Sequence, residues 1–240
     1  MVTAKYVESR GTMSFGAVDA VTGETVLPIG AGNAAVKYEF MEHTLDANCW
    51  YERKTAGGTI GFANHASGRG LELALTNANE IQLAAVDQQN RDASRPLLCC
   101  SFEARAAFSV LPTGSVVAVL GFIGDHNADP DAINRSAWFR WDGSGAVTVE
   151  TDDGTSETSK VATGLTVTAN EFHVYKVDLC FETLECRFYI DGAQVAASTT
   201  FAYDSGVSLQ HYLRIGKEAA AAAVGTLVVD YCQVWQRRYF

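Results

Sequence analysis

A run of polar residues at positions 125–131, DHNADPD, has the residue types of a cation-binding loop. Its oxygen-bearing side chains at alternate positions belong to Asp125, Asn127, Asp129 and Asp131. Ca²⁺ takes such hard oxygen ligands, and alternate residues of a tight loop can all face inward. The pattern then breaks, because Pro130 stands where a helix-loop-helix calcium site needs glycine and Ser136 stands where it needs glutamate. The sequence therefore predicts a solvated acidic loop with weak metal candidates, and no bound metal or other cofactor.

Three aromatic residues just before a glycine-rich turn form a second candidate site: Trp138, Phe139 and Trp141. On a strand, residues 139 and 141 share one face while residue 138 faces the other way. A solvent-facing pair of aromatic rings is a common means of stacking against sugar rings. The same residues would equally fill the core between two sheets. The sequence leaves a glycan-binding surface and a packed core both open.

Residues suited to acid–base or nucleophilic catalysis are scattered along the chain. The histidines are His43, His65, His126, His173 and His211. None of them lies beside a Gly-x-Ser-x-Gly nucleophile turn. The glycines at 68 and 70 lack the Lys-Ser/Thr pair that grips a phosphate. Glu72 and Glu80 belong to different predicted elements. These patterns predict a protein without catalytic activity.

Short strands must position all of these residues. Residues 172–195, FHVYKVDLCFETLECRFYIDGAQV, alternate with a period of two, which indicates two strands joined by an acidic turn. The second arm ends at Asp191-Gly192, a dipeptide that tolerates the positive φ of a tight turn. Residues 71–75 alternate in the same way, whereas 97–108 and 115–123 are nearly continuous apolar runs typical of central strands. The pattern predicts an all-β protein.

Six cysteines are present, none with the spacing of metal ligands. They are predicted to be reduced and mostly buried. A disulfide from Cys180 to Cys186 across the hairpin is geometrically possible and is the one to test.

Four stretches of sequence, in the expected order, resemble the concanavalin A-like jelly rolls, the superfamily of legume lectins, laminin G modules and laminarinase-type glucanases. They are the 172–195 hairpin, LDANCW at 45–50, SFEARA at 101–106 and GTLVVDYCQVW at 225–235. The resemblance spans about residues 40–236 and implies an antiparallel two-sheet jelly-roll sandwich. It marks the fold more strongly than the function.

The resemblance also offers a test of catalysis. Retaining glucanases of this superfamily use two nearby carboxylates, in a Glu-x-Asp-x-x-Glu motif or a near variant, on the strand after the Phe-Glu-Ala-Arg strand. Here that strand corresponds to residues 115–123, which contain no acidic residue. The resemblance therefore adds to the expectation of a non-enzymatic protein.

Composition sets the scale and excludes some partners. With 240 residues, 48% of them hydrophobic, the chain can form one globular domain with a full core. The formal charge of −10 argues against a nucleic-acid partner. No apolar window is long enough for a membrane span, and the N-terminus does not resemble a secretion signal. We expect an N-terminal arm or extension at 1–38 and a sandwich domain at 39–240.

The LDANCW stretch, the acidic loop ETDDGT and the DYCQVWQ ending resemble structural proteins of tailed bacteriophages. This resemblance implies a capsid decoration (cement) protein that stabilises the shell, exposed on the virion after assembly in the host cytoplasm. Its partners would be the major capsid protein and further copies of itself, as a dimer or trimer. The alternative is a carbohydrate-binding, lectin-like module, for example in a tail fibre, that binds surface glycan through Trp138, Phe139 and Trp141.

Overall fold

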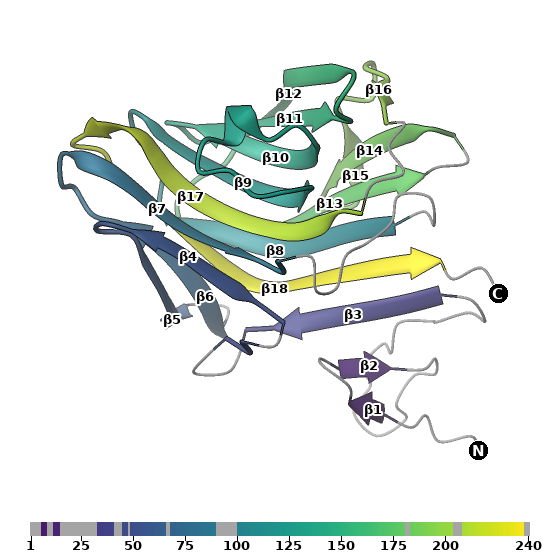
Figure 1. Ribbon diagram of the computed structural model, residues 1–240, viewed down its shortest axis with the longest axis horizontal. Coiled ribbons are helices and arrows are strands. Elements are labelled where there is room, and N and C mark those ends of the chain that lie inside the picture. Colours follow the sequence, from purple (N-terminus) through teal and green to yellow (C-terminus); the bar gives the residue numbers. More distant parts are fainter. Residues whose placement is uncertain are drawn as a thin grey trace.

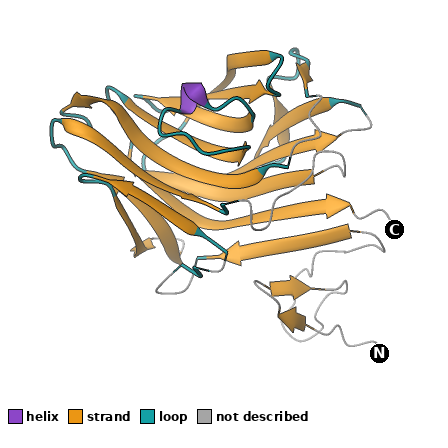
Figure 2. Ribbon diagram, in the orientation of Figure 1, coloured by secondary structure: helices purple, strands orange, loops and turns teal. Residues whose placement is uncertain are grey.

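The computed structural model describes residues 6–8, 12–14, 33–40, 45–47, 49–65, 68–89, 100–180, 183–203 and 208–237. Across these residues the chain forms two antiparallel β-sheets packed face to face (Figures 1 and 2). Helical structure within the described part is confined to a single 3₁₀ turn, η2 (Pro130–Ala132). None of its helical segments is long and apolar enough to cross a membrane. The predicted all-β jelly-roll sandwich is confirmed.

The larger sheet has eleven strands, of which eight follow the order β1-β2-β3-β18-β8-β13-β14-β15. Strand β6 pairs with both β18 and β5, and β16 pairs with β14. The bounds are β1 (Tyr6–Glu8), β2 (Thr12–Ser14), β3 (Asn33–Glu39), β5 (Thr59–His65), β6 (Gly68–Leu75), β8 (Cys100–Val110), β13 (His173–Cys180), β14 (Glu185–Ile190), β15 (Ala193–Val195), β16 (Phe201–Ala202) and β18 (Gly225–Arg237).

The smaller sheet has seven strands in the order β12-β11-β10-β9-β17-β7-β4. Its bounds are β4 (Tyr51–Thr55), β7 (Glu80–Asp87), β9 (Val116–Ile123), β10 (Ser136–Asp142), β11 (Ala146–Asp152), β12 (Glu157–Thr166) and β17 (Gln210–Ala221). Every residue of β9 is buried, as its continuous apolar sequence predicts for a strand covered on both faces.

The predicted hairpin at 172–195 is present as β13, β14 and β15. Asp191 and Gly192 turn the chain with φ of 50° and 81°, the left-handed region that this dipeptide tolerates. The possible Cys180–Cys186 disulfide is not formed, because Cys186 is a buried free thiol. Antiparallel pairing places Cys186 opposite Leu179 rather than Cys180.

Aromatic rings from both sheets meet in the core. Trp141 of β10 packs edge-on against Phe108 of β8 and Tyr175 of β13, with ring centroids 5.2 and 5.1 Å away. Phe139 packs edge-on against Phe188 at 5.4 Å. Each such side chain contributes roughly 1.5–3 kcal/mol through removal from water. These contacts hold the seven-stranded sheet rigidly and direct its alternate residues outward.

The predicted division at residue 38 falls inside the larger sheet. Strand β3 pairs with the last strand, β18, from Asn33↔Arg237 to Glu39↔Tyr231. The segment before the predicted boundary therefore extends the sheet over these residues. Whether residues 1–38 act as a separate arm stays a prediction.

Candidate functional site

The outer face of the seven-stranded sheet, turned away from the core, carries a row of arginines. Strand pairing aligns Arg53 of β4, Arg214 of β17 and Arg140 of β10, with Ala85 and Val119 on the strands between them. Alternate strands of a sheet lie about 10 Å apart, so the small intervening side chains leave room for three long cations. The register of the sheet, which joins distant segments of sequence, creates this row.

Residues 124–135 connect β9 to β10 and lie on this face; we call them the covering loop. Figure 1 shows the 3₁₀ turn of the covering loop in front of β9 and β10. Its Ile133 is buried in an apolar cluster with Val119, Trp138 and Tyr212. Arg214 donates a hydrogen bond to the Ala128 carbonyl at 2.8 Å. The covering loop is therefore held on the sheet both by the apolar contacts of Ile133 and by this hydrogen bond.

The predicted metal candidates all belong to the covering loop. The Asn127 side chain accepts a hydrogen bond from the Asp129 backbone, and the Asp129 side chain accepts one from the Asp131 backbone, each at 3.0 Å. Asp131 pairs with Arg140, and Asp125 is exposed at the start of the loop. Carboxylate oxygens of Asp129, Asp131 and Glu218 lie within 4.8 Å of one another. The side chains of Asn127 and Asp129 therefore hold the shape of the loop, and that of Asp131 pairs with Arg140. The prediction of no bound metal stays untested.

Arg140 is the centre of a cluster of acidic groups, which we call the Arg140 cluster: Arg140, Asp131, Asp142 and Glu150. The arginine side chain is only 1% exposed. Its Nε donates to Asp142 Oδ1 at 2.8 Å, and one terminal nitrogen pairs with Asp131 and lies 3.6 Å from Glu150 Oε2. The Asp131 and Glu150 carboxyl groups are therefore close together, because both reach the same nitrogen.

The surroundings push the pKa values of these two carboxyl groups apart. Burial raises the pKa of Glu150 from 4.5 to about 7, since the Arg140 charge opposes this only in part and Asp131 adds like charge. The hydrogen bond from Arg140 holds the pKa of Asp131 below its ordinary value. Near neutral pH the cluster thus contains a nearly buried acid that retains much of its proton beside an exposed carboxylate. One proton donor and one ionised carboxylate are the groups that general acid–base chemistry needs.

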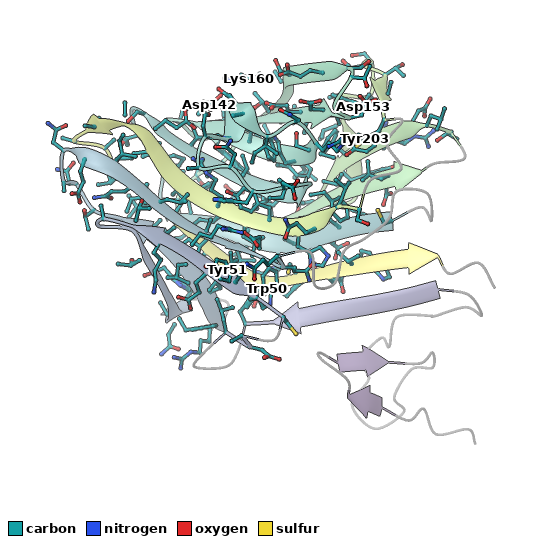
Figure 3. The ribbon with its side chains drawn as sticks, in the orientation of Figure 1. Trp50, Tyr51, Asp142, Asp153, Lys160 and Tyr203 are labelled. Carbon is teal, nitrogen blue, oxygen red and sulfur yellow. The ribbon has the colours of Figure 1, made fainter. Side chains whose placement is uncertain are left out.

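The cluster reaches the surface through its outer members. The Asp131 side chain is 52% exposed, and Asp142 lies 3.4 Å from Lys160 Nζ in an exposed pair. Figure 3 shows Asp142 and Lys160 together at one edge of the molecule, away from Trp50 and Tyr51. Glu150, with a side chain 6% exposed, lies beneath.

The three aromatic candidates are fully buried in this structure. Phe139 and Trp141 point into the core, and Trp138 lies on the outer face beneath the covering loop. As they stand, these side chains offer no stacking surface, and their role as glycan contacts is unsupported by their placement. The large aromatic exposed on this face is Tyr51, with the Arg53 guanidinium 4.7 Å from its ring centre.

Sequence reasoning missed Arg140, Glu150 and Arg214. The one available signal was a charged residue alternating with large aromatics in WFRWD at 138–142, which is unusual for a strand with both faces covered. Glu150 is ten residues further along and reaches Arg140 only through the β10–β11 pairing.

The sequence matches no known protein-family model and no curated protein. Several solved structures resemble the fold. The GlcNAcα1-4Gal-releasing endo-β-galactosidase from Clostridium perfringens aligns with a TM-score of 0.62 and 15% identity, over 88% of this chain and 65% of that chain. The catalytic domain of an endo-1,3-β-glucanase (laminarinase) from Thermotoga petrophila aligns with a TM-score of 0.59 and 13% identity, over 85% of this chain and 97% of that chain.

A viral protein resembles it as well. The conserved carbohydrate esterase vb_24B_21 from Shiga toxin-encoding bacteriophage phi24B aligns with a TM-score of 0.51 and 14% identity, over 84% of this chain and 97% of that chain.

These likenesses bear on the fold and on one functional expectation. The prediction of a non-enzymatic protein is contradicted, because the similar structures are mostly glycoside hydrolases. Residues 115–123, which correspond to the strand that bears the acidic motif in the glucanases, contain no acidic residue. The acidic groups of this chain instead gather around Arg140 from other segments. At identities this low the likeness establishes the fold. The chain has the concanavalin A-like jelly-roll fold.

Proposed function

We propose that this protein binds a β-linked polysaccharide and cleaves it at the Arg140 cluster. The observation that carries the proposal is the split in protonation between Glu150, whose pKa is raised to about 7, and Asp131, whose pKa is lowered. Glycosidases use one carboxylic acid as proton donor and a second, ionised carboxylate beside it. The names of similar structures, an endo-β-galactosidase and laminarinases, suggest β-galactans and β-glucans as substrates.

Each group has a defined task in this scheme. Glu150 donates its proton to the glycosidic oxygen as the bond to the anomeric carbon breaks, and Asp131 attacks that carbon to form a glycosyl ester. Water then hydrolyses the ester, with Glu150 accepting the proton from that water. Attack by Asp131 on the anomeric carbon makes this a two-step route, which retains the anomeric configuration.

Arg140 holds the pair in place, and the covering loop controls access to it. The guanidinium keeps Asp131 ionised and positions it beside Glu150. Glu150 is nearly buried and Asp131 belongs to the covering loop, so a sugar chain must reach Glu150 beside this loop while the pairing with Arg140 keeps Asp131 in place.

The test is release of reducing ends from laminarin, mixed-linkage β-glucan and β-galactan by the purified protein. Glu150→Gln and Asp131→Asn should each lower kcat about 100-fold or more, because each removes one partner of the acid–base pair. Glu52→Gln, a change of the same type at an exposed position on β4, should leave the rate unchanged. Absence of any cleavage by the wild-type protein, or equal rates in Glu150→Gln and wild type, would refute the cleavage step.

A second candidate is a virion protein that decorates the capsid, favoured by the similarity to the phage phi24B protein. Its partners would be the major capsid protein and further copies of this chain, at the virion surface. Both roles can belong to one protein, since a polysaccharide-cleaving site suits a particle that meets a cell surface. Co-sedimentation with undecorated capsids, with and without residues 1–38, tests this candidate: a protein that stays in the supernatant in both forms does not decorate them.

A further inference from the structure

The outer face of the eleven-stranded sheet presents a regular array of polar and aromatic side chains. On its central strands, β18, β8, β13 and β14, strand pairing aligns two neighbouring rows. We call these rows the platform: Gln233, Glu103, Lys176 and Tyr189 form one row, and Trp235, Ser101, Asp178 and Arg187 form the other. The alternate residues of the same strands are buried in the core, so the platform sits on rigid elements.

Aromatic rings stand at opposite ends of the platform. Tyr189 lies on β14 and Trp235 on β18, with two strands between them, and both are partly exposed. Lys176 stands between them, with its Nζ 5.4 Å from the Tyr189 ring centre and 5.9 Å from that of Trp235, so the two ring centres are at most about 11 Å apart. Two rings at this separation can stack against different residues of one extended oligosaccharide.

The polar groups between the rings are held at fixed positions. Glu103 Oε1 accepts hydrogen bonds from Tyr231 Oη at 2.9 Å and from Gln233 Nε2 at 2.6 Å. Asp178 pairs with Lys176 at 2.9 Å and accepts a hydrogen bond from Ser101. The Lys176 and Asp178 side chains are 34% and 27% exposed, so they remain reachable by a ligand. Preorganised planar acceptors and donors suit the hydroxyl groups of a sugar, because little ordering is left to binding.

The balance of charge on this face argues against a polyanion. Lys176 is matched by Asp178, and Arg187 by Glu185 at 3.0 Å. The formal charge of the whole chain is −10, which opposes nucleic acid and other polyanions further. The ligand that suits rings at both ends and balanced hydrogen-bonding groups between them is a neutral polysaccharide.

We propose that the platform is a neutral-polysaccharide binding site, with the sugar chain lying across the strands from Tyr189 to Trp235. It lies on the opposite sheet from the Arg140 cluster and does not depend on cleavage there. A site of this kind anchors the protein to a polymer while a separate site acts on it, or serves alone for attachment.

Binding to laminarin, mixed-linkage β-glucan and β-galactan, measured by affinity electrophoresis, tests this proposal. The measurements use Glu150→Gln protein, so that cleavage cannot remove the polymer. In that background, Tyr189→Ala and Trp235→Ala should each weaken binding about tenfold, and the double variant should weaken it further, to whatever retention the Arg140 face alone provides. Tyr51→Ala, which removes an exposed aromatic from the other sheet, is the matched control and should leave retention unchanged. Circular dichroism confirms that each variant is folded.

Two outcomes would overturn the proposal. One is full retention by the folded double variant, which would place binding elsewhere on the molecule. The other is failure of the Glu150→Gln protein to bind any of the three polymers, including when the wild-type protein cleaves them. Because cleavage is read from the wild-type protein and binding from the platform variants, failure of the proposed catalytic function leaves this test intact.

Discussion

The two outward faces of the sandwich contain similar residue types, yet they meet water differently. On the seven-stranded sheet the covering loop leaves Arg140 only 1% exposed among three carboxyl groups. On the eleven-stranded sheet Lys176 and Asp178 form a pair that is 34% and 27% exposed. Buried charges lose their hydration and depend on each other, whereas exposed pairs are screened by solvent. The comparison teaches that the coverage of a face determines how much each of its ion pairs contributes to the free energy of unfolding.

Coverage also separates the functions that we propose for the two faces. A buried cluster can hold a proton near neutral pH, as the raised pKa of Glu150 indicates, and so it suits chemistry. An open face with fixed hydrogen-bonding groups suits recognition. Changes on the two sheets should therefore affect different measurements and differ in size.

The largest expected effect comes from removing the cation of the covered face. Arg140→Met leaves three carboxyl groups facing one another, and breaking a buried ion pair in this way costs about 3–5 kcal/mol. Arg105→Met is the matched control on the open face, where Arg105 pairs with Asp230 at 2.6 Å with its side chain 30% exposed. It should cost less than about 1 kcal/mol. Urea unfolding measures both, and equal losses would erase the distinction between the faces.

Glu150→Gln should have an effect of opposite sign that depends on pH. The raised pKa of Glu150 means that the folded protein binds more protons than the unfolded chain between pH 4.5 and about 7, so wild-type stability falls as the pH rises through this window. Glutamine is neutral throughout. The variant should therefore gain about 2.5 kcal/mol over wild type between pH 5 and pH 8.

The measurement is the free energy of unfolding of both proteins at the two pH values. Glu52→Gln, at an exposed position on β4, is the control for the loss of a carboxylate elsewhere on the surface. A difference between Glu150→Gln and wild type that stays constant from pH 5 to pH 8 would mean that Glu150 does not titrate as a buried acid.

His211 extends the comparison to a group covered on every side. It lies in the core with its ring about 6.0 Å from those of Phe102 and Phe122, and burial lowers its pKa from 6.5 to about 3. Below pH 6.5 the unfolded chain binds a proton that the folded protein does not, so stability is lost as the pH falls. His211→Phe should reduce the loss between pH 7 and pH 5 by about 2 kcal/mol.

His126 contributes to the same acid loss, since its pKa is lowered to about 4 by burial and by the nearby Arg53. Some pH dependence should therefore remain in His211→Phe. Unfolding curves at pH 7, 6 and 5 measure it, and a variant with the same slope as wild type would show that His211 is not the buried group responsible.

The fold was accessible from the sequence because its signals are local. Period-two alternation and Asp191-Gly192 define the 172–195 hairpin, and the continuous apolar run near residue 120 marks a strand covered on both faces. Each signal is contained within a few neighbouring residues. Local backbone preference and burial are sufficient to produce it.

The Arg140 cluster was not accessible, because it depends on register and on the path of a loop. Glu150 meets Arg140 only when β10 pairs with β11, and Asp131 arrives from a loop whose sequence also imitates a calcium site. The same ambiguity affected Trp138, Phe139 and Trp141, because their alternation showed which of them share a face but left open whether that face is covered. Alternation determines which side chains share a face, and tertiary packing determines which faces stay wet.

The smallest expected change in stability belongs to Lys176→Met on the open face. This change removes one ion pair with Asp178 but retains an unbranched side chain against Tyr189 and Trp235. The free energy of unfolding should change by less than about 1 kcal/mol, because exposed pairs contribute little. Retention on laminarin, mixed-linkage β-glucan or β-galactan should nevertheless weaken severalfold, since Lys176 supplies the hydrogen-bond donor at the centre of the platform. Urea unfolding and affinity electrophoresis on the same samples separate the two effects. A large loss of stability with unchanged retention would make Lys176 a structural residue. The open face would then stabilise the fold as the covered face does, and the proposed difference between the two faces would be lost.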